Sequence, residues 1–314
     1  MDLVEIPDNP VPSGAVSGTI ETEDGRHIRF ARWRPTARRN VGTVCVFTGR
    51  AEFIEKYFET VSDLRRRGFN VAIIDWRGQG GSDRAQKNPA KGHVDDFEEY
   101  ERDVAALMTQ IVLPDCPPPY FALGHSMGGC VLLGLATQPG GWFERIVMTA
   151  PMVQIPQGGR GLFFLSEMLA LAGFGSLFVP GGTSKPTNAV AFAGNPFTGD
   201  PVRLERVNEL VRAEPRLGLG APTIGWLNAA GKAMARLQDP AYGYSVRTPV
   251  LIVAAGDDKV VSTRAIERLA VHMRGAKHLV IPGARHEILM ERDSVRELFW
   301  AAFDGFVPGE PVYG

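Results

Sequence analysis

A serine stands at the centre of a glycine-flanked pentapeptide, Gly124-His125-Ser126-Met127-Gly128. The apolar run 120–123 predicts a strand before it, and a helix is predicted to begin near Gly129. The two outer glycines let neighbouring backbone approach closely while the serine holds a strained conformation in the turn. A serine presented in this way attacks carbonyl carbon once a base removes its proton. The pattern therefore predicts nucleophilic catalysis by Ser126.

His286 is the predicted base among the six histidines of the chain. It follows the predicted strand 278–281 on a loop before the last helix, where an imidazole can swing over the end of the sheet. His125 is too constrained to reach the neighbouring hydroxyl and is predicted to pack beneath the turn. The remaining four are predicted to be solvated side chains: His27, His93, His272 and His278.

A carboxylate is required to orient such a base, and two compete for this role. Asp257 and Asp258 both follow the apolar run 250–255, which predicts the strand before the histidine strand. The position in the chain does not separate them. The order serine, acid, histidine is that of α/β-hydrolases and differs from the order in chymotrypsin or subtilisin.

Alternating strands and helices are predicted to position these residues. The turn Asp24-Gly25 predicts a hairpin over 16–34 at the antiparallel edge of a sheet. Apolar periodicity predicts helices over 53–67 and 96–111 and a last helix that carries residues 295–306. Further strands are predicted at 43–47, 70–75 and 145–149. Repeated strand–helix units predict an α/β fold with a mostly parallel sheet, helices on both faces, and a site at the carboxyl ends of the strands.

The alternation breaks over residues 152–240, which predicts an inserted helical cap between two parts of the core, 1–151 and 241–314. An apolar run at 162–174 and an amphipathic stretch at 226–237 are the main features of this insertion. Together they are predicted to line an acyl tunnel or to rest on a membrane surface. For any single residue, packing of the cap onto the core is the simpler interpretation.

The composition excludes several other classes of function. Apolar residues make up 44% of the 314 residues and charged residues 22%, and the net charge of -1 gives no field that would attract nucleic acid. Six arginines lie close together in the sequence and are predicted to form a solvated strand edge: Arg26, Arg29, Arg32, Arg34, Arg38 and Arg39. The glycine-rich stretch 75–82 lacks the lysine of a phosphate-binding loop.

The cellular context is predicted from cysteines and from the amino terminus. Cys45, Cys116 and Cys130 are too few and too scattered for a disulfide framework or a zinc site. The amino terminus lacks a signal-peptide pattern, and no apolar stretch is long enough to span a membrane. A cytoplasmic protein is therefore expected, with at most a peripheral association with the membrane surface. No metal or organic cofactor is expected.

Three stretches resemble the lysophospholipase and monoacylglycerol lipase family: residues 49–57, residues 75–82 and residues 124–129. The resemblance covers nearly the whole chain and implies the α/β-hydrolase fold with a cap. Residues 195–198 and 222–226 are similar to the cap of bacterial lysophospholipase-like members. The resemblance implies hydrolysis of fatty-acid esters, of a lysophospholipid or a monoacylglycerol.

The resemblance also implies roles for individual residues. In that family the acid typically precedes a basic residue and a valine, and Asp258-Lys259-Val260 fits this pattern better than Asp257, which is then a capping or neighbouring carboxylate. Two backbone N–H groups are expected to form the oxyanion hole, those of Met127 and Arg50. Relatives usually carry histidine where this chain has Thr48, so the support of the Arg50 loop is left open.

The predicted reaction is a two-step hydrolysis through an acyl-enzyme on Ser126. Alternatives within enzymes are a small-molecule esterase or a carbon–carbon bond hydrolase on the same fold, whereas a haloalkane dehalogenase is disfavoured by serine in place of aspartate. Outside enzymes, the alternatives are a ligand receptor that kept the hydrolase fold and a peripheral membrane-binding module. The sequence indicates neither the headgroup, nor the acyl length, nor the oligomeric state.

Overall fold

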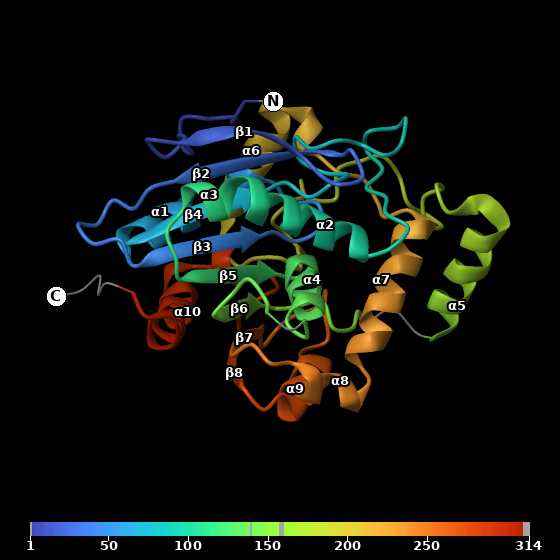
Figure 1. Ribbon diagram of the computed structural model, residues 1–314. Coiled ribbons are helices and arrows are strands. Elements are labelled where there is room, and N and C mark those ends of the chain that lie inside the picture. Colours follow the sequence, from blue (N-terminus) through green and yellow to red (C-terminus); the bar gives the residue numbers. More distant parts are fainter. Residues whose placement is uncertain (1, 139, 157–159, 310–314) are drawn as a thin grey trace.

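The computed structural model describes residues 2–138, 140–156 and 160–309, and its centre is an eight-stranded sheet (Figure 1). The strand order is β1-β2-β4-β3-β5-β6-β7-β8. The strands are β1 (Val16–Glu21), β2 (His27–Trp33), β3 (Gly42–Phe47), β4 (Phe69–Ile74), β5 (Tyr120–His125), β6 (Arg145–Thr149), β7 (Val250–Ala255) and β8 (Ala276–Ile281). Strand β2 pairs antiparallel with both β1 and β4, and the strands from β4 to β8 are parallel. The predicted mostly parallel sheet with an amino-terminal hairpin is confirmed.

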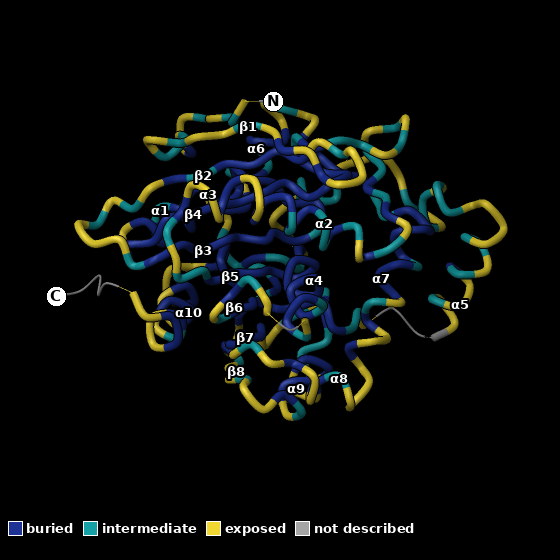
Figure 2. The backbone as a smooth tube through the Cα atoms, in the orientation of Figure 1, coloured by how far each residue is buried: buried dark blue, intermediate teal, exposed yellow. Residues whose placement is uncertain are grey.

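Helices cover both faces of the sheet, as predicted. The principal ones are α1 (Phe58–Arg66), α2 (Glu98–Leu107), α4 (Met127–Leu135), α9 (Thr263–His272) and α10 (Asp293–Phe306). Val61 of α1 and Phe299 of α10 pack on one face with Val44 of β3, whereas Val104 of α2 and Leu132 of α4 pack on the other. All residues of β3, β4 and β7 are buried between these layers (Figure 2).

The predicted helix 96–111 is interrupted in the structure. After α2 the backbone widens into a π-helical turn, Met108–Val112, and then forms the short α3 (Leu113–Asp115). Pro114 has no backbone N–H and cannot donate to the carbonyl of Gln110, so regular α-helical bonding cannot continue there. The predicted helix 53–67 likewise begins as a 3₁₀ turn, Ile54–Tyr57.

The segment between β6 and β7 contains α5 (Arg160–Leu169), α6 (Pro201–Ala213), α7 (Ile224–Leu237) and α8 (Pro240–Ser245). Trp226 of α7 is buried against the core, and Phe163 of α5 lies against Gly231 of α7. Helix α5 lies beyond α7 at the right-hand edge of the molecule in Figure 1. The predicted boundaries of a cap at 152 and 240 stay a prediction.

A buried ion cluster ties the amino-terminal hairpin to the sheet. The Arg29 guanidinium donates through Nε to Asp75 Oδ2 at 2.7 Å and through both Nη atoms to Glu55 at 2.8 Å. Asp75 also accepts from the backbone N–H groups of Ile54 and Gly81. The prediction of a solvated strand edge is therefore wrong for Arg29, because β2 is an inner strand and its arginine neutralises two buried carboxylates.

Arg29→Met is expected to lower the free energy of unfolding by about 3–5 kcal/mol, because it leaves Glu55 and Asp75 buried without their cation. Urea unfolding measures the change. Arg32→Met is the control: its 3.0 Å bridge to Asp115 is partly exposed and is expected to contribute less than about 1 kcal/mol. Equal losses in the two variants would contradict a special role of the buried cluster.

Candidate active site

Ser126 occupies a strained turn between β5 and α4. Its φ of 48° and ψ of -110° lie in a region that side-chain-bearing residues rarely adopt. A side chain at Gly124 would place its Cβ 2.6 Å from Leu132, and one at Gly128 would collide with the backbone of Phe47. The Ser126 N–H donates to the Thr149 carbonyl at 3.1 Å. Close packing with the strands on either side therefore holds the serine in the predicted turn.

Three side chains that are distant in sequence meet at this turn. His286, on the loop between β8 and α10, places Nε2 3.0 Å from Ser126 Oγ and Nδ1 2.8 Å from Asp258 Oδ2. The His286 side chain is 4% exposed and that of Asp258 is fully buried. The structure thus joins a hydroxyl, an imidazole and a carboxylate in one hydrogen-bonded line, the arrangement that activates a serine.

The two neighbouring aspartates have different surroundings. Asp258 Oδ1 accepts from the backbone N–H groups of Val260 and Val261 at 2.8 and 2.9 Å. Burial opposes ionisation of Asp258, but the hydrogen bonds from His286 and from these amides outweigh it and lower the pKa of the carboxyl. Asp257 is exposed, and among the described residues its one hydrogen bond runs from its backbone N–H to the Ala284 carbonyl. The geometry therefore places Asp258, and not Asp257, against the histidine.

The other histidines are mostly where the sequence suggests. His27 and His278 are exposed, and His125 is buried beneath the serine turn. His93 differs, because its side chain is only 10% exposed and its Nδ1 lies 2.8 Å from Thr223 Oγ1. Thr223 caps the start of α7 by accepting from the Trp226 N–H. The prediction of a solvated His93 is wrong because a segment remote in sequence covers its loop.

Residues 48–51 form the loop after β3, and side chains that the sequence analysis did not single out support it. Gln79 accepts from the Ala51 N–H at 3.0 Å and donates to the Gly49 carbonyl at 2.8 Å. The Trp76 indole N–H donates to the Thr48 carbonyl at 2.8 Å. The loop is thus held without a histidine at position 48. A signal was present in the sequence, since both supporting residues belong to the stretch 75–82.

The predicted oxyanion donors belong to the loop after β3 and to the first residue of α4. Within the described residues, no hydrogen bond occupies the backbone N–H of Arg50 or of Met127. Arg50 lines the cavity that contains Ser126, and Met127 begins α4, where the first N–H groups of a helix lack partners. Their assignment as an oxyanion hole stays a prediction.

A buried lysine links two loops of the site. Lys56 Nζ lies 2.7 Å from Glu52 Oε1 and 2.7 Å from Glu287 Oε1. Glu52 also accepts from the Tyr57 hydroxyl at 2.7 Å and from the Gly49 N–H. Burial works against the charge on Glu52, but Lys56 prevails and lowers the pKa of this carboxyl to about 2. The i,i+4 spacing of Glu52 and Lys56 was the available sequence signal.

His125 lies between this cluster and the base. Its Nδ1 is 3.0 Å from Thr149 Oγ1, its Nε2 is 3.9 Å from Glu52, and its ring centre is 4.8 Å from that of His286. Burial lowers the pKa of His125 to about 4. His125 is therefore neutral near pH 7 and adds no charge beside the imidazole that faces Ser126.

Ser126 opens into a cavity of about 290 Å³. Its apolar lining consists of Ala51, Met152, Ile155, Phe197, Pro222, Trp226, Val260 and Val261. The lining also includes polar residues: Arg50, Glu52, His125, Ser126, Thr187, Asn188, His286 and Glu287. The apolar run 162–174 does not contribute to the described lining, whereas Trp226 of the stretch 226–237 does. An acyl tunnel stays a prediction.

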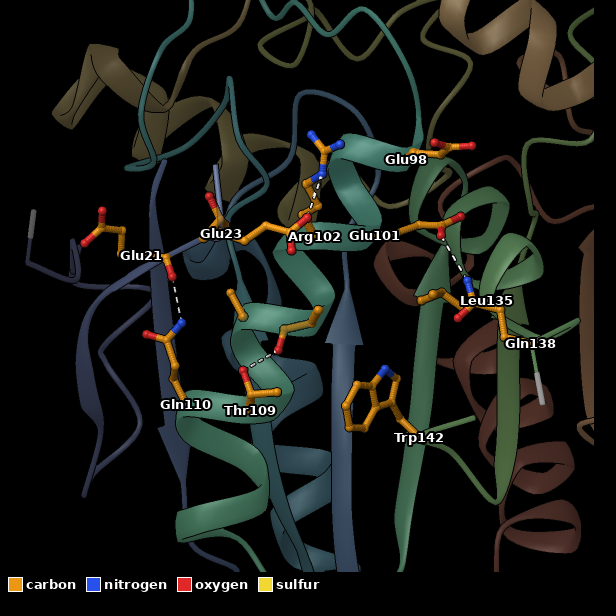
Figure 3. Close-up of a pocket in the computed structure, with 13 residues that line it drawn as sticks. Glu21, Glu23, Glu98, Glu101, Arg102, Thr109, Gln110, Leu135, Gln138 and Trp142 are labelled. Atoms are coloured by element: carbon orange, nitrogen blue, oxygen red, sulfur yellow. Dashed lines mark hydrogen bonds and ion pairs between the residues drawn. The ribbon is translucent and has the colours of Figure 1, made fainter. Parts of the chain in front are cut away.

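A larger hollow, of about 830 Å³, lies between the hairpin β1–β2, α2 and the end of α4 (Figure 3). Glu23 pairs with Arg102 at 3.0 Å, and Glu101 accepts from Gln138 at 3.1 Å (Figure 3). The described residues that line it include no serine, cysteine or histidine. This hollow therefore lacks the nucleophile and base that the smaller cavity brings together.

Comparison with known proteins identifies the family of this chain. The profile of the Hydrolase_4 family, described as "Serine aminopeptidase, S33", matches residues 38–293. Lysophospholipase L2 of Escherichia coli strain K12 is 34% identical over 86% of this chain and 81% of its own length. A monoacylglycerol lipase of Mycolicibacterium smegmatis is 25% identical over 85% of this chain and 88% of its own length.

The fold has close counterparts among solved structures. A soluble variant of monoglyceride lipase from Saccharomyces cerevisiae, in complex with a substrate analogue, superimposes with a TM-score of 0.72 at 19% identity. The superposition covers 92% of this chain and 95% of that one. The fold is thus that of an α/β-hydrolase, and the chain belongs to the Hydrolase_4 family of serine hydrolases.

Proposed function

We propose that this chain is a carboxylic ester hydrolase that cleaves fatty-acid esters, with Ser126 as nucleophile, His286 as base and Asp258 as the orienting acid. The observation that carries the proposal is the hydrogen-bonded line of these three side chains, two of which, Ser126 and His286, line a cavity with many apolar residues. The related lysophospholipase L2 and monoacylglycerol lipase support a lipid ester as the substrate.

The reaction follows from the positions of the atoms. His286 Nε2 takes the proton of Ser126 Oγ while the oxygen attacks the ester carbonyl carbon, and the proton then passes to the departing alcohol. Water then attacks the acyl carbonyl carbon and loses a proton to the same nitrogen; the bond to Ser126 Oγ breaks, the fatty acid departs, and the proton returns to Oγ. Asp258 holds the imidazole and stabilises its cation. The N–H groups of Arg50 and Met127 receive the negative oxygen of each tetrahedral intermediate.

The family description raises peptide hydrolysis as a second activity, but the charges in the cavity oppose it. An aminopeptidase has to receive the positively charged amino terminus of its substrate, which a free carboxylate would favour. The lining carboxylates Glu52 and Glu287 both bind Lys56. Arg50 adds a positive charge to the same cavity. An uncharged or anionic ester fits these charges better than a peptide.

Residues 152–240 are proposed to act as a cap that also contacts the lipid surface. Helix α5 and the turn after it expose large apolar side chains: Leu162, Phe164, Leu165, Met168, Leu171 and Phe174. Such a surface suits an enzyme that collects amphiphilic substrates from a lipid layer. No helix among the described residues has the length and apolar character needed to cross a bilayer.

Ser126→Ala is expected to reduce fatty-acid release by about 10⁶-fold and Asp258→Asn by about 10⁴-fold, because the nucleophile or the orientation of the base is lost. Release from a lysophospholipid and from a monoacylglycerol of equal chain length is the assay. Asp257→Asn is the matched control and is expected to stay near the wild-type rate. Substantial activity of the Ser126→Ala enzyme would refute the proposed mechanism.

Acid is expected to destabilise the protein partly through His125. Its folded pKa of about 4 lies below the value of about 6.5 for an unfolded histidine, so the unfolded chain takes up the proton first as the pH falls. The free energy of unfolding is therefore expected to fall, by a few kcal/mol as an order of magnitude, between pH 7 and pH 4. Urea unfolding of His125→Gln should therefore depend less on pH over this interval. An unchanged slope would show that His125 does not contribute.

The double variant Phe164→Asp, Leu171→Asp is expected to sediment with phosphatidylcholine vesicles at least tenfold less than the wild type, because each buried apolar side chain contributes roughly 1.5–3 kcal/mol. Hydrolysis of a water-soluble short-chain ester should persist. Val271→Asp on α9, where the valine is 84% exposed, is the control for added charge alone. Equal sedimentation of all three proteins would exclude α5 as the contact surface.

A further inference from the structure

Among the described residues, Arg50 differs from two buried arginines near the site, Arg29 and Arg77, in having no anionic partner. Arg29 and Arg77 each bind two or more carboxylates. In the part of the chain that the structure describes, Arg50 pairs with none: its Nη2 donates to the Gly220 carbonyl at 2.9 Å, and its buried Nε donates to nothing. Most of the hydrogen-bonding capacity of this guanidinium is unused.

The guanidinium is held at the wall of the cavity that contains Ser126. Its carbon lies 5.0 Å from the centre of the Trp226 ring, and both residues line that cavity. Trp226 is itself fixed by donating to the Tyr100 hydroxyl at 3.1 Å. A stacked arginine on an anchored indole is a rigid, preformed cation.

Within the described residues, the Arg50 guanidinium is therefore a cation of this cavity wall with no carboxylate in salt-bridge contact. The carboxylates of the cavity, Glu52 and Glu287, are both engaged by Lys56. Burial lowers the pKa of Arg50 to about 10, so the side chain stays protonated at neutral pH. A partly dehydrated cation without a counterion is unfavourable, and a substrate anion that enters the cavity would relieve this.

We propose that the side chain of Arg50 binds the phosphodiester of a lysophospholipid whose ester carbonyl lies at Ser126. This inference rests on the proposed ester hydrolysis and names the headgroup class. A glycerol backbone separates the ester from the phosphodiester, and an arginine side chain separates its backbone N–H from its guanidinium over a similar length. One residue thus serves both the oxyanion, through its backbone, and the phosphodiester, through its side chain.

The test compares kcat/KM for lysophosphatidylcholine and for a monoacylglycerol of equal acyl length, in micelles of one uncharged detergent. Arg50→Gln is expected to reduce the lysophosphatidylcholine value roughly 10- to 100-fold more than the monoacylglycerol value, the range typical of a hydrogen bond to a charged group. Arg50→Lys keeps the charge and should restore part of the ratio.

Arg84→Gln is the matched control. Arg84 also has an unpartnered buried nitrogen, on Nη1, but it donates to the Gly80 and Arg216 carbonyls outside the cavity. The substrate ratio should not change in this variant. A fall by the same factor on both substrates in Arg50→Gln would overturn the proposal, since it would indicate loss of loop structure. Weaker inhibition by added fatty acid with an unchanged ratio would also overturn it, assigning Arg50 to the product carboxylate.

Binding of an ether-linked lysophosphatidylcholine, which has no ester to cleave, separates this proposal from the proposed hydrolysis. Calorimetry with the wild type and with Arg50→Gln should give a dissociation constant at least tenfold weaker for the variant. If the wild type releases no fatty acid from either substrate yet shows this difference, the hydrolase function fails and the phosphodiester site stands. Equal binding by the two proteins overturns the site irrespective of turnover.

Discussion

The positive φ of Ser126 is the constraint on which the rest of the site depends. A residue with a side chain adopts this conformation only when its surroundings leave no alternative. Here the neighbouring strands supply that constraint, because parallel pairing sets β5 between β3 and β6 and brings their carboxyl ends to one edge. The Thr149 carbonyl, which accepts from the Ser126 N–H, and the backbone of Phe47, which lies against Gly128, then fix the turn. The Ser126 hydroxyl thereby faces His286 on the loop between β8 and α10.

Buried charge stabilises the loops at this edge of the sheet. Asp75 accepts from Ile54 at the start of the 3₁₀ turn before α1 and from Gly81 in the turn after β4, and Arg29 compensates its buried charge. Such clusters contribute little net stability compared with apolar packing. They do fix the orientation of the loops, because the guanidinium donates and the carboxylates accept only in specific directions. The resulting rigidity is what a site with hydrogen bonds of about 3 Å requires.

The sequence predicted the sheet, the hairpin and the meeting of Ser126 with His286, because these follow from periodicity and from glycine-flanked turns that are local in the chain. The choice of Asp258 over Asp257 needed the family resemblance, and the geometry agrees with it. The roles of Arg29, Gln79 and His93 were not predicted, since each depends on a partner from a remote segment. Local sequence patterns indicate which face of a helix or strand a residue occupies. They do not identify the remote segment that packs on that face.

Lys56 gives the site a mechanical property that no single loop has. Its ammonium forms ion pairs with Glu52, which follows the loop after β3, and with Glu287, which follows His286. The loop that would receive the oxyanion and the loop that carries the base therefore share an anchor beneath the cavity. The two ion pairs therefore tie the spacing of these loops to the position of a single side chain.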